Sequence, residues 1–348
     1  MANLGAYIVR RLILLIFVIL GVTVLIFAVT MLFSPAQRAL LYVRNVQHTN
    51  EASINNIIHQ YGLNDPFYVQ YFNWVYQLLQ GNLGWSATAG EPVTTAILTK
   101  WPYTFEIVLF AAPIIIFIGI YFGVQAAIHK DGPIDHASRV FSVIGWSLPS
   151  FFLGFLLLAI FYGILHWFSP GSLSQTALNF ETNPASHFVR YTHVDLFDGL
   201  LNGQPWISLN ALEHLVMPVA TIVTIDCALL IRVMRSSMLE SMSKPYITTA
   251  KAKGLSNKVV IYKHARRNAL IPVATLSGML VAGLLGGLII TETVFGFGGI
   301  GAWSAHAAES IDIPAVLGYA VLSAILFVIA NLIVDVLYAY IDPRIRLD

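Results

Sequence analysis

Residues 12–37 read LILLIFVILGVTVLIFAVTMLFSPAQ, an apolar run without an ionisable side chain, and Arg10 and Arg11 precede it. The hydrocarbon core of a bilayer is about 30 Å thick, and a helix needs roughly 20 apolar residues to cross it. A secretory signal has an apolar core of only about 7–15 residues and a small-residue cleavage site. This run is longer and ends at Phe33-Ser34-Pro35, so it predicts a first membrane span that is not cleaved.

Five further apolar segments follow the first. The composition agrees with several membrane spans, because 57% of the residues are hydrophobic and only 11% are charged, whereas soluble domains carry about 25% charged residues. The sequence therefore predicts an all-α, polytopic membrane protein with about six transmembrane helices and no separate soluble catalytic domain. The five segments are Ile107–Ile128, Val140–Leu165, Leu215–Ile231, Asn268–Thr291 and Ile313–Val334.

The positions of lysine and arginine predict the orientation, because basic residues favour the cytoplasmic side. With the N-terminus inside, 15 of the 19 basic residues fall in cytoplasmic segments. The sequence therefore predicts a multi-pass protein with both termini in the cytoplasm. The basic residues that fall outside are Arg38, Arg44, Lys100 and Arg190.

Three connections between the predicted spans are too long to be simple turns. The first is external and contains Phe67–Leu79, whose apolar spacing predicts an amphipathic helix at the membrane surface. The second, residues 166–213, is an external loop, and the third, residues 232–267, is cytoplasmic and holds nearly half of the basic residues. Residues 1–102 thus comprise the first transmembrane helix and the external amphipathic segment, and residues 103–348 form a core with five transmembrane helices.

The cytoplasmic loop is the most informative connection. Residues 246–253 are good helix formers, several with small side chains, and Gly254 stands where a helix can end in a left-handed cap. A second helical run leads to Pro272, which is tolerated only at a helix start or a kink. The spacing favours a helix–turn–helix with a small-residue surface that another protein can approach closely. A basic linker held at the lipid headgroups is the alternative.

This loop resembles the cytoplasmic motif of the permease subunits of binding-protein-dependent ABC importers, which reads Glu-Ala-Ala, three residues, then Gly. Thr248, Thr249, Ala250 and Gly254 stand at these positions, so the Glu is missing and one Ala is replaced. Pro272 also lies further from the Gly than in the general motif. Both departures look like the dipeptide, oligopeptide and nickel branch. The candidate ATPase-coupling residues are Thr248, Thr249, Ala250, Lys251, Ala252, Lys253, Gly254 and Leu255.

Other segments resemble the B-type inner-membrane permease of the same branch. Asn82 stands where the family has Asp, and Ser34-Pro35-Ala36 replaces the family's Pro-Gly-Asp. The external stretch from about Ser169 to Gln204 matches no pattern of this branch. The matching segments are Tyr7–Leu12, Gly21–Thr23, Tyr61–Pro66, Gly81–Ser86, Ser147–Phe151, Glu292–Phe295 and Asp342–Arg344.

The resemblance implies a type I ABC importer permease of a prokaryotic cell membrane, a pore-forming subunit without a cofactor that makes no bonds itself. Its expected partners are a second homologous permease, two ATP-binding subunits, an extracellular substrate-binding protein and membrane lipid, but no nucleic acid. The cytoplasmic helix would dock in a groove of an ATPase and transmit ATP-driven closure to the permeases. Peptides are the expected substrates, and oligosaccharides or a nickel chelate are the alternatives.

Four residues are candidates for the translocation pathway. Asp226 is the acidic residue well inside a predicted span, where a charge costs about 2.5–3.5 kcal/mol on insertion scales. It either lines a pathway or makes an interhelical hydrogen bond as a protonated acid. Gly278, Ala282 and Gly286 recur at every fourth position of the fifth span, which favours close helix packing. A smooth wall of the pathway is the alternative, and both can hold at an interface between permeases.

Residues 296–301, GFGGIG, fit the dinucleotide-binding pattern G-x-G-x-x-G. That pattern has meaning only between a strand and a helix, and here it follows a membrane span, so a flexible turn is favoured. No phosphate-loop pattern occurs, so ATP hydrolysis is expected in a partner chain. The histidines show no metal-ligand spacing. An ion-coupled secondary transporter or a membrane-embedded enzyme is disfavoured, because the sequence lacks an internal repeat, further intramembrane charge and a nucleophile motif.

Overall fold

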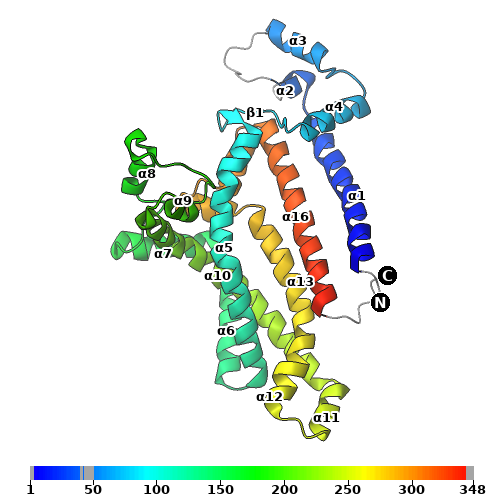
Figure 1. The fold of residues 1–348 in the computed structure, drawn as a ribbon, viewed down its shortest axis with the longest axis vertical. Helices are drawn as coiled ribbons and strands as arrows, with labels where there is room; N and C mark the ends of the chain where they lie inside the picture. The colour runs from blue at the N-terminus through cyan, green and yellow to red at the C-terminus, as the bar shows by residue number, and fades with distance from the viewer. Residues whose placement is uncertain (1–3, 40–41, 43–50, 342–348) are drawn as a thin grey trace.

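The computed structural model describes residues 4–39, 42 and 51–341, and within them the protein is almost entirely helical (Figure 1). The strands in these residues are β1 (Trp85–Ser86) and β2 (Glu91–Pro92), a short antiparallel pair. The all-α prediction is therefore confirmed. The long helices are α1 (Leu4–Thr30), α5 (Val93–Ile128), α10 (Pro205–Ser243), α13 (Arg266–Leu285) and α16 (Ile313–Ile341).

Several helices are suited to a membrane. Four helical segments are long and apolar enough to cross it: α5, α10, the run Asn257–Leu285 and residues 313–333 of α16. A bent pair that begins with α6 (Pro133–Ser147) adds a fifth if its two limbs form one span. α1 is a further helix of 27 residues. The protein is thus a multi-pass membrane protein, and the number of six spans stays a prediction.

The third predicted span, Val140–Leu165, is not one straight helix. α6 ends at Ser147, and α7 (Ser150–Leu157) with the π-helix η3 (Leu158–Ile164) continues at 99° to it. Leu148 and Pro149 at the break are both extended, because the residue before a proline avoids the helical region. The prediction of a continuous span was wrong at this point.

The fifth predicted span also ends earlier than expected. It was predicted to reach Thr291, whereas α13 stops at Leu285. The chain then turns at Gly287, whose φ of +133° is open to glycine but strained for other residues. Two short helices, α14 (Ile289–Phe295) and α15 (Ile300–Glu309), follow before α16 begins.

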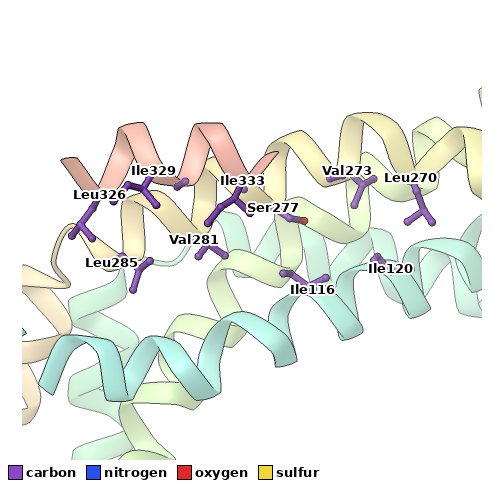
Figure 2. Close-up of a pocket in the computed structure, with 13 residues that line it drawn as sticks. Ile116, Ile120, Leu270, Val273, Ser277, Val281, Leu285, Leu326, Ile329 and Ile333 are labelled. Atoms are coloured by element: carbon purple, nitrogen blue, oxygen red, sulfur yellow. The ribbon is translucent and has the colours of Figure 1, made fainter. Parts of the chain in front are cut away.

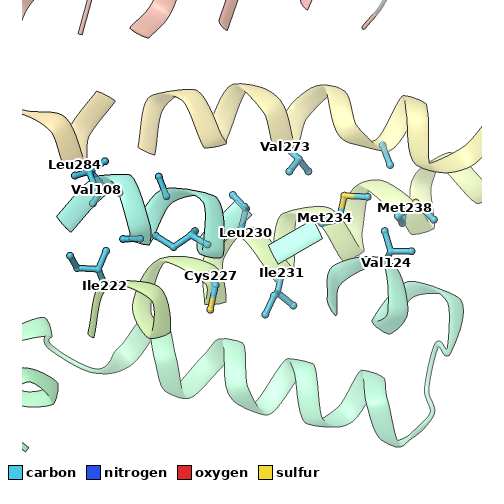
Figure 3. Close-up of a cluster of buried hydrophobic side chains, with 14 of the residues drawn as sticks. Val108, Val124, Ile222, Cys227, Leu230, Ile231, Met234, Met238, Val273 and Leu284 are labelled. Carbon is cyan, nitrogen blue, oxygen red and sulfur yellow. The ribbon is translucent and has the colours of Figure 1, made fainter. Parts of the chain in front are cut away.

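The core of the molecule is the crossing of α5 and α10. Leu230 and Met234 of α10 are fully buried there, in the cluster drawn in Figure 3. A Cβ added at Gly119 would lie 2.5 Å from the Leu230 Cβ, and one at Gly123 would lie 2.5 Å from the Met234 Cβ. Glycines four residues apart therefore let the two helix backbones approach closely.

The N-terminal arm lies at one edge of the molecule, where its α1 packs along α16 (Figure 1). It comprises α1, α2 (Pro35–Ala39), α3 (Glu51–Gln60) and α4 (Phe67–Leu79). α4 coincides with the predicted amphipathic helix, and its Tyr71 and Trp74 are buried against Phe27 of α1. The proposed division at residue 102 falls inside the continuous helix α5 and stays a prediction.

Residues 166–213 form a folded subdomain, here called the external subdomain after the side of the membrane that the sequence predicts for it. It contains α8 (Gln175–Thr182), the 3-10 turn η4 (Pro184–Ser186), α9 (Asp195–Leu201) and the first turns of α10. Arg190 at its centre forms an ion pair with Glu181 and lies 3.7 Å from the Asp195 carboxylate. Arg190 also donates a hydrogen bond of 2.5 Å to the Tyr103 hydroxyl of α5. The external subdomain is thereby fixed to the membrane core.

Candidate coupling loop and translocation site

α11 (Pro245–Ala252) and α12 (Asn257–Val259) form one tip of the molecule, at the opposite end from α2–α4 (Figure 1). The chain turns between them at Gly254, which has a φ of +75°. The Gly254 amide donates to the Lys251 carbonyl at 2.9 Å. The predicted helix–turn–helix and its left-handed cap are therefore confirmed. The π-helix η5 (Val260–Ala265) then leads into α13.

α11 has a buried face and an exposed face. Ile247 and Ala250 belong to the central hydrophobic cluster, and Ala250 is only 7% exposed. Ala250 therefore packs inside the chain and offers no surface to a partner. The surface at this tip combines apolar and basic groups, because Leu255 is 40% exposed and Lys258 is also exposed. The exposed coupling candidates are Thr248, Thr249, Lys251, Ala252, Lys253, Gly254 and Leu255.

α10 connects this tip to the external subdomain without interruption. It has 39 residues, which corresponds to a length of about 58 Å at 1.5 Å per residue. Only Lys244 separates it from α11. Near the tip, Arg235 of α10 forms a bidentate ion pair with the fully buried Asp135 of α6, with one N–O distance of 2.8 Å. A displacement of α11 can therefore be passed to α6 and to the external subdomain through α10.

Asp226 lies near the middle of α10, about 32 Å from Pro205 at 1.5 Å per residue. Its side chain is half-buried and makes no hydrogen bond or ion pair with another described residue. The interhelical hydrogen bond considered for it is thus not formed within the described part of this chain. Among the same residues, no group of three or more His, Cys, Asp or Glu side chains could hold a metal ion.

A cavity of about 360 Å³ lies between α5, α13 and α16 (Figure 2). Its lining is apolar except for Ser277, whose buried Oγ has no hydrogen-bond partner in the described residues. Gly278 lines this cavity, whereas Ala282 is buried and Gly286 is the C-cap of α13. Asp226 does not line it. The chain by itself does not bring the four pathway candidates into one site.

A second apolar cavity of about 600 Å³ adjoins the first on α5 and ends at Arg266. The two cavities share Ile116 and Ile120. Phe117 beside them is 68% exposed. The two cavities are therefore neighbours along α5, and lipid or another helix commonly covers apolar surface of this kind in a membrane protein.

Comparison with known protein families identifies the family of this chain. The model of the binding-protein-dependent transport system inner membrane component matches residues 115–347, and the model of the N-terminal part of such membrane components matches residues 4–108. The chain belongs to this family. It is a multi-pass permease subunit of an ABC transport system, not an enzyme, and such a system has ATP-binding and substrate-binding partners.

Curated relatives match the permease over nearly its full length. It is 36% identical over 331 residues to the probable D,D-dipeptide transport system permease protein of Escherichia coli strain K12, covering 95% of this chain and 94% of that one. It is 38% identical over 343 residues to the di/tripeptide transport system permease protein of Pseudomonas aeruginosa strain UCBPP-PA14, covering 98% of each. It is 34% identical over 344 residues to the oligopeptide transport system permease protein of Bacillus subtilis strain 168, covering 99% and 100%.

Two structural features of the permease were not predicted from its sequence. Gly119 and Gly123 have the small-xxx-small spacing of a close helix contact, and this signal was present in the sequence but overlooked. The ion pair of Asp135 with Arg235 joins residues 100 positions apart, so no local pattern identifies it.

Proposed function

We propose that the permease forms half of the pore of an ATP-driven peptide importer. The observation that carries this proposal is the set of near-full-length relatives, which bear the names of dipeptide, di/tripeptide and oligopeptide permeases. The other half of the pore would be a second homologous permease, and two ATP-binding subunits and an extracellular substrate-binding protein would complete the importer. Oligosaccharides and nickel chelates are weaker alternatives, because none of these three relatives bears such a name.

The exposed face of α11 and the Gly254 turn dock on an ATP-binding subunit. The lysine bias supports a cytoplasmic position for this tip and for both chain termini. Lys251, Lys253 and Lys258 are exposed around the turn, so the docking groove has an acidic rim beside an apolar floor that receives Leu255. ATP-driven closure of the ATPases displaces α11, and α10 transmits that displacement through the membrane.

Asp226 lines the translocation pathway between the two permeases. Its position near the middle of α10 and its lack of a described hydrogen-bond partner support this role, since intramembrane acids usually face a cavity or a partner. A carboxylate there attracts the ammonium group of a peptide, because a low dielectric strengthens such contacts. Gly278, Ala282 and Gly286 serve close helix packing beside that pathway.

Reconstituted transport tests the proposed substrate class. The permease, its second permease, its ATPases and its binding protein are placed in proteoliposomes, and uptake of a radiolabelled dipeptide is measured with ATP. Excess unlabelled dipeptide or tripeptide should suppress the uptake, whereas a maltooligosaccharide or a nickel chelate should not. Uptake of the sugar or of nickel without uptake of peptide would refute the peptide assignment.

A further inference from the structure

Glu292 of α14 is a fully buried acid to which the family motif and the proposed function give no role. Its carboxylate accepts hydrogen bonds from three donors. The Leu288 amide lies 3.1 Å and the Thr104 hydroxyl 2.5 Å from Oε1, and the Ala302 amide lies 2.7 Å from Oε2. A buried carboxylate requires such donors, because its charge is costly to remove from water. Glu292 therefore holds three segments together: α5, the start of α14 and α15.

This set of hydrogen bonds around the Glu292 carboxylate is here called the Glu292 joint. Thr104 adds one more hydrogen bond to it. Its hydroxyl oxygen accepts a hydrogen bond of 3.0 Å from the Ile300 amide at the start of α15. The single hydroxyl proton is then directed at the Glu292 carboxylate. Ala302, in the first turn of α15, contributes an amide that has no partner within its own helix. The Glu292 carboxyl group therefore also lies at the positive end of the α15 dipole.

The glycine-rich segment 296–301 is shaped around this carboxylate. A Cβ added at Gly299 would lie 2.6 Å and 2.7 Å from the two carboxylate oxygens of Glu292. A Cβ at Gly301 would lie 2.7 Å from the Ile289 amide nitrogen and 3.0 Å from the Glu292 Oε2. The sequence favoured a flexible turn here, but the glycines instead let the backbone close tightly around Glu292.

The same joint reaches the end of α13 and the external subdomain. The Trp101 indole of α5 donates to the Leu285 carbonyl, the last residue of α13, at 3.2 Å. At the other end of α14, the Phe295 carbonyl accepts a hydrogen bond of 2.7 Å from the Gly171 amide. The His214 ring of α10 contacts the Gly171 carbonyl at 3.0 Å. These contacts bind the segments on either side of the Glu292 joint to α13 and to α10.

We propose that Glu292 is a positioning residue for transport, and that with Thr104 it makes α5, α14 and α15 move as one body where they meet. The helical run Asn257–Leu285 follows the coupling tip without interruption, so displacement of the tip travels along α13. The Trp101 bond passes movement of the far end of α13 to α5, and the Glu292 joint determines whether α14 and α15 follow α5. The proposal rests on the proposed function only for its transport readout.

The first measurement needs no substrate. Spin labels are placed at Leu98 of α5 and Thr293 of α14, both exposed, in a Cys227→Ser background of the assembled complex. Distances are recorded by pulsed electron paramagnetic resonance without nucleotide and with ATP. The wild type should give one narrow distribution that is the same in both states. Glu292→Gln replaces an acceptor oxygen with an NH₂ group, so the distribution should broaden and should change with ATP.

Variants of Thr104 separate positioning from simple folding. Thr104→Val keeps the shape but removes the hydroxyl, whereas Thr104→Ser retains it. Thr104→Val and Glu292→Gln should each lower the peptide imported per ATP hydrolysed, because each removes or weakens a hydrogen bond of the joint. Thr104→Ser should behave as wild type, as should Glu309→Gln, which removes an exposed charge at the end of α15.

The outcomes distinguish this inference from the proposed function. Unchanged distance distributions in both Glu292→Gln and Thr104→Val would overturn the positioning role, whatever the substrate. The same holds if transport and ATP hydrolysis fall in equal proportion, because that result indicates loss of folded complex alone. A wild-type complex that imports no peptide would instead refute the proposed function, and the distance measurement would still test Glu292.

Discussion

Replacement of Gly123 by alanine should loosen the crossing of α5 and α10. The new Cβ would lie 2.5 Å from the Met234 Cβ and 2.9 Å from the Ile231 carbonyl oxygen. Ordinary contacts between carbon atoms are about 3.5–4.0 Å, so the helices must separate by roughly 1 Å. The backbone oxygen of Ile231 cannot move aside by a side-chain rotation. Overpacking of this kind costs about 1–3 kcal/mol, against a gain of about 1 kcal/mol from the better helix propensity of alanine.

Gly283 of α13 provides the matched control. A Cβ at this position meets no atom within 4 Å, so Gly283→Ala gains helix propensity without a clash. Thermal unfolding of the purified permease in detergent should show a lower midpoint for Gly123→Ala and an equal or higher midpoint for Gly283→Ala. If the two variants unfold at the same temperature, close packing of α5 on α10 does not stabilise the fold.

Three further predictions concern orientation, pH and the pathway. A cysteine at Lys251 in a Cys227→Ser background should resist an impermeant thiol reagent in intact cells, whereas one at the exposed Asn183 should react. Labelling at position 251 from outside would contradict the predicted cytoplasmic position of the α11 tip. Burial raises the pKa of Asp195 to about 6, so the native state binds more protons than the unfolded state between about pH 4 and 6, and stability should fall as the pH rises through this window. Asp195→Asn should flatten that dependence in a thermal-unfolding series, and an unchanged slope would exclude Asp195 as its source. Asp226→Asn, which keeps the shape but removes the charge, should assemble normally and import cationic peptides more slowly than neutral ones in an uptake assay; equal rates for all peptides would remove Asp226 from the pathway.

Periodicity and apolar length predicted the elements that depend on local sequence. The long apolar runs predicted the membrane helices. The apolar spacing of Phe67–Leu79 predicted α4 with its bounds, and Gly254 predicted the end of α11. The bend at Leu148-Pro149 was missed because the apolar run continues through it, although the proline itself was the available signal. The turn after Leu285 was missed for a similar reason, since Gly286 and Gly287 stand within an apolar stretch.

The burial and the partners of several residues depend on tertiary contacts, which the sequence pattern did not predict. Ala250 was counted as docking surface, but the packing of α11 buries it. The buried position of Glu292 was not predicted, because its partners Thr104 and Ala302 come from other helices. The buried contacts of Arg190 with Glu181 and Tyr103 likewise join three separate elements. Neither periodicity nor residue spacing specifies such contacts between distant segments.

In the proposed function, ATP hydrolysis drives peptide uptake through contact of the α11 tip with an ATPase. This coupling is tested most directly by measuring dipeptide uptake and ATP hydrolysis on the same proteoliposomes, for the wild type and for Gly254→Val. Valine is strained at a φ of +75°, and a Cβ at this position meets no atom within 4 Å, so the variant should alter the docking turn and leave the membrane helices assembled. Wild-type uptake should require ATP and the binding protein, and Gly254→Val should lose both uptake and substrate-stimulated hydrolysis. Uptake driven by an ion gradient without ATP, or wild-type rates in Gly254→Val, would contradict this coupling.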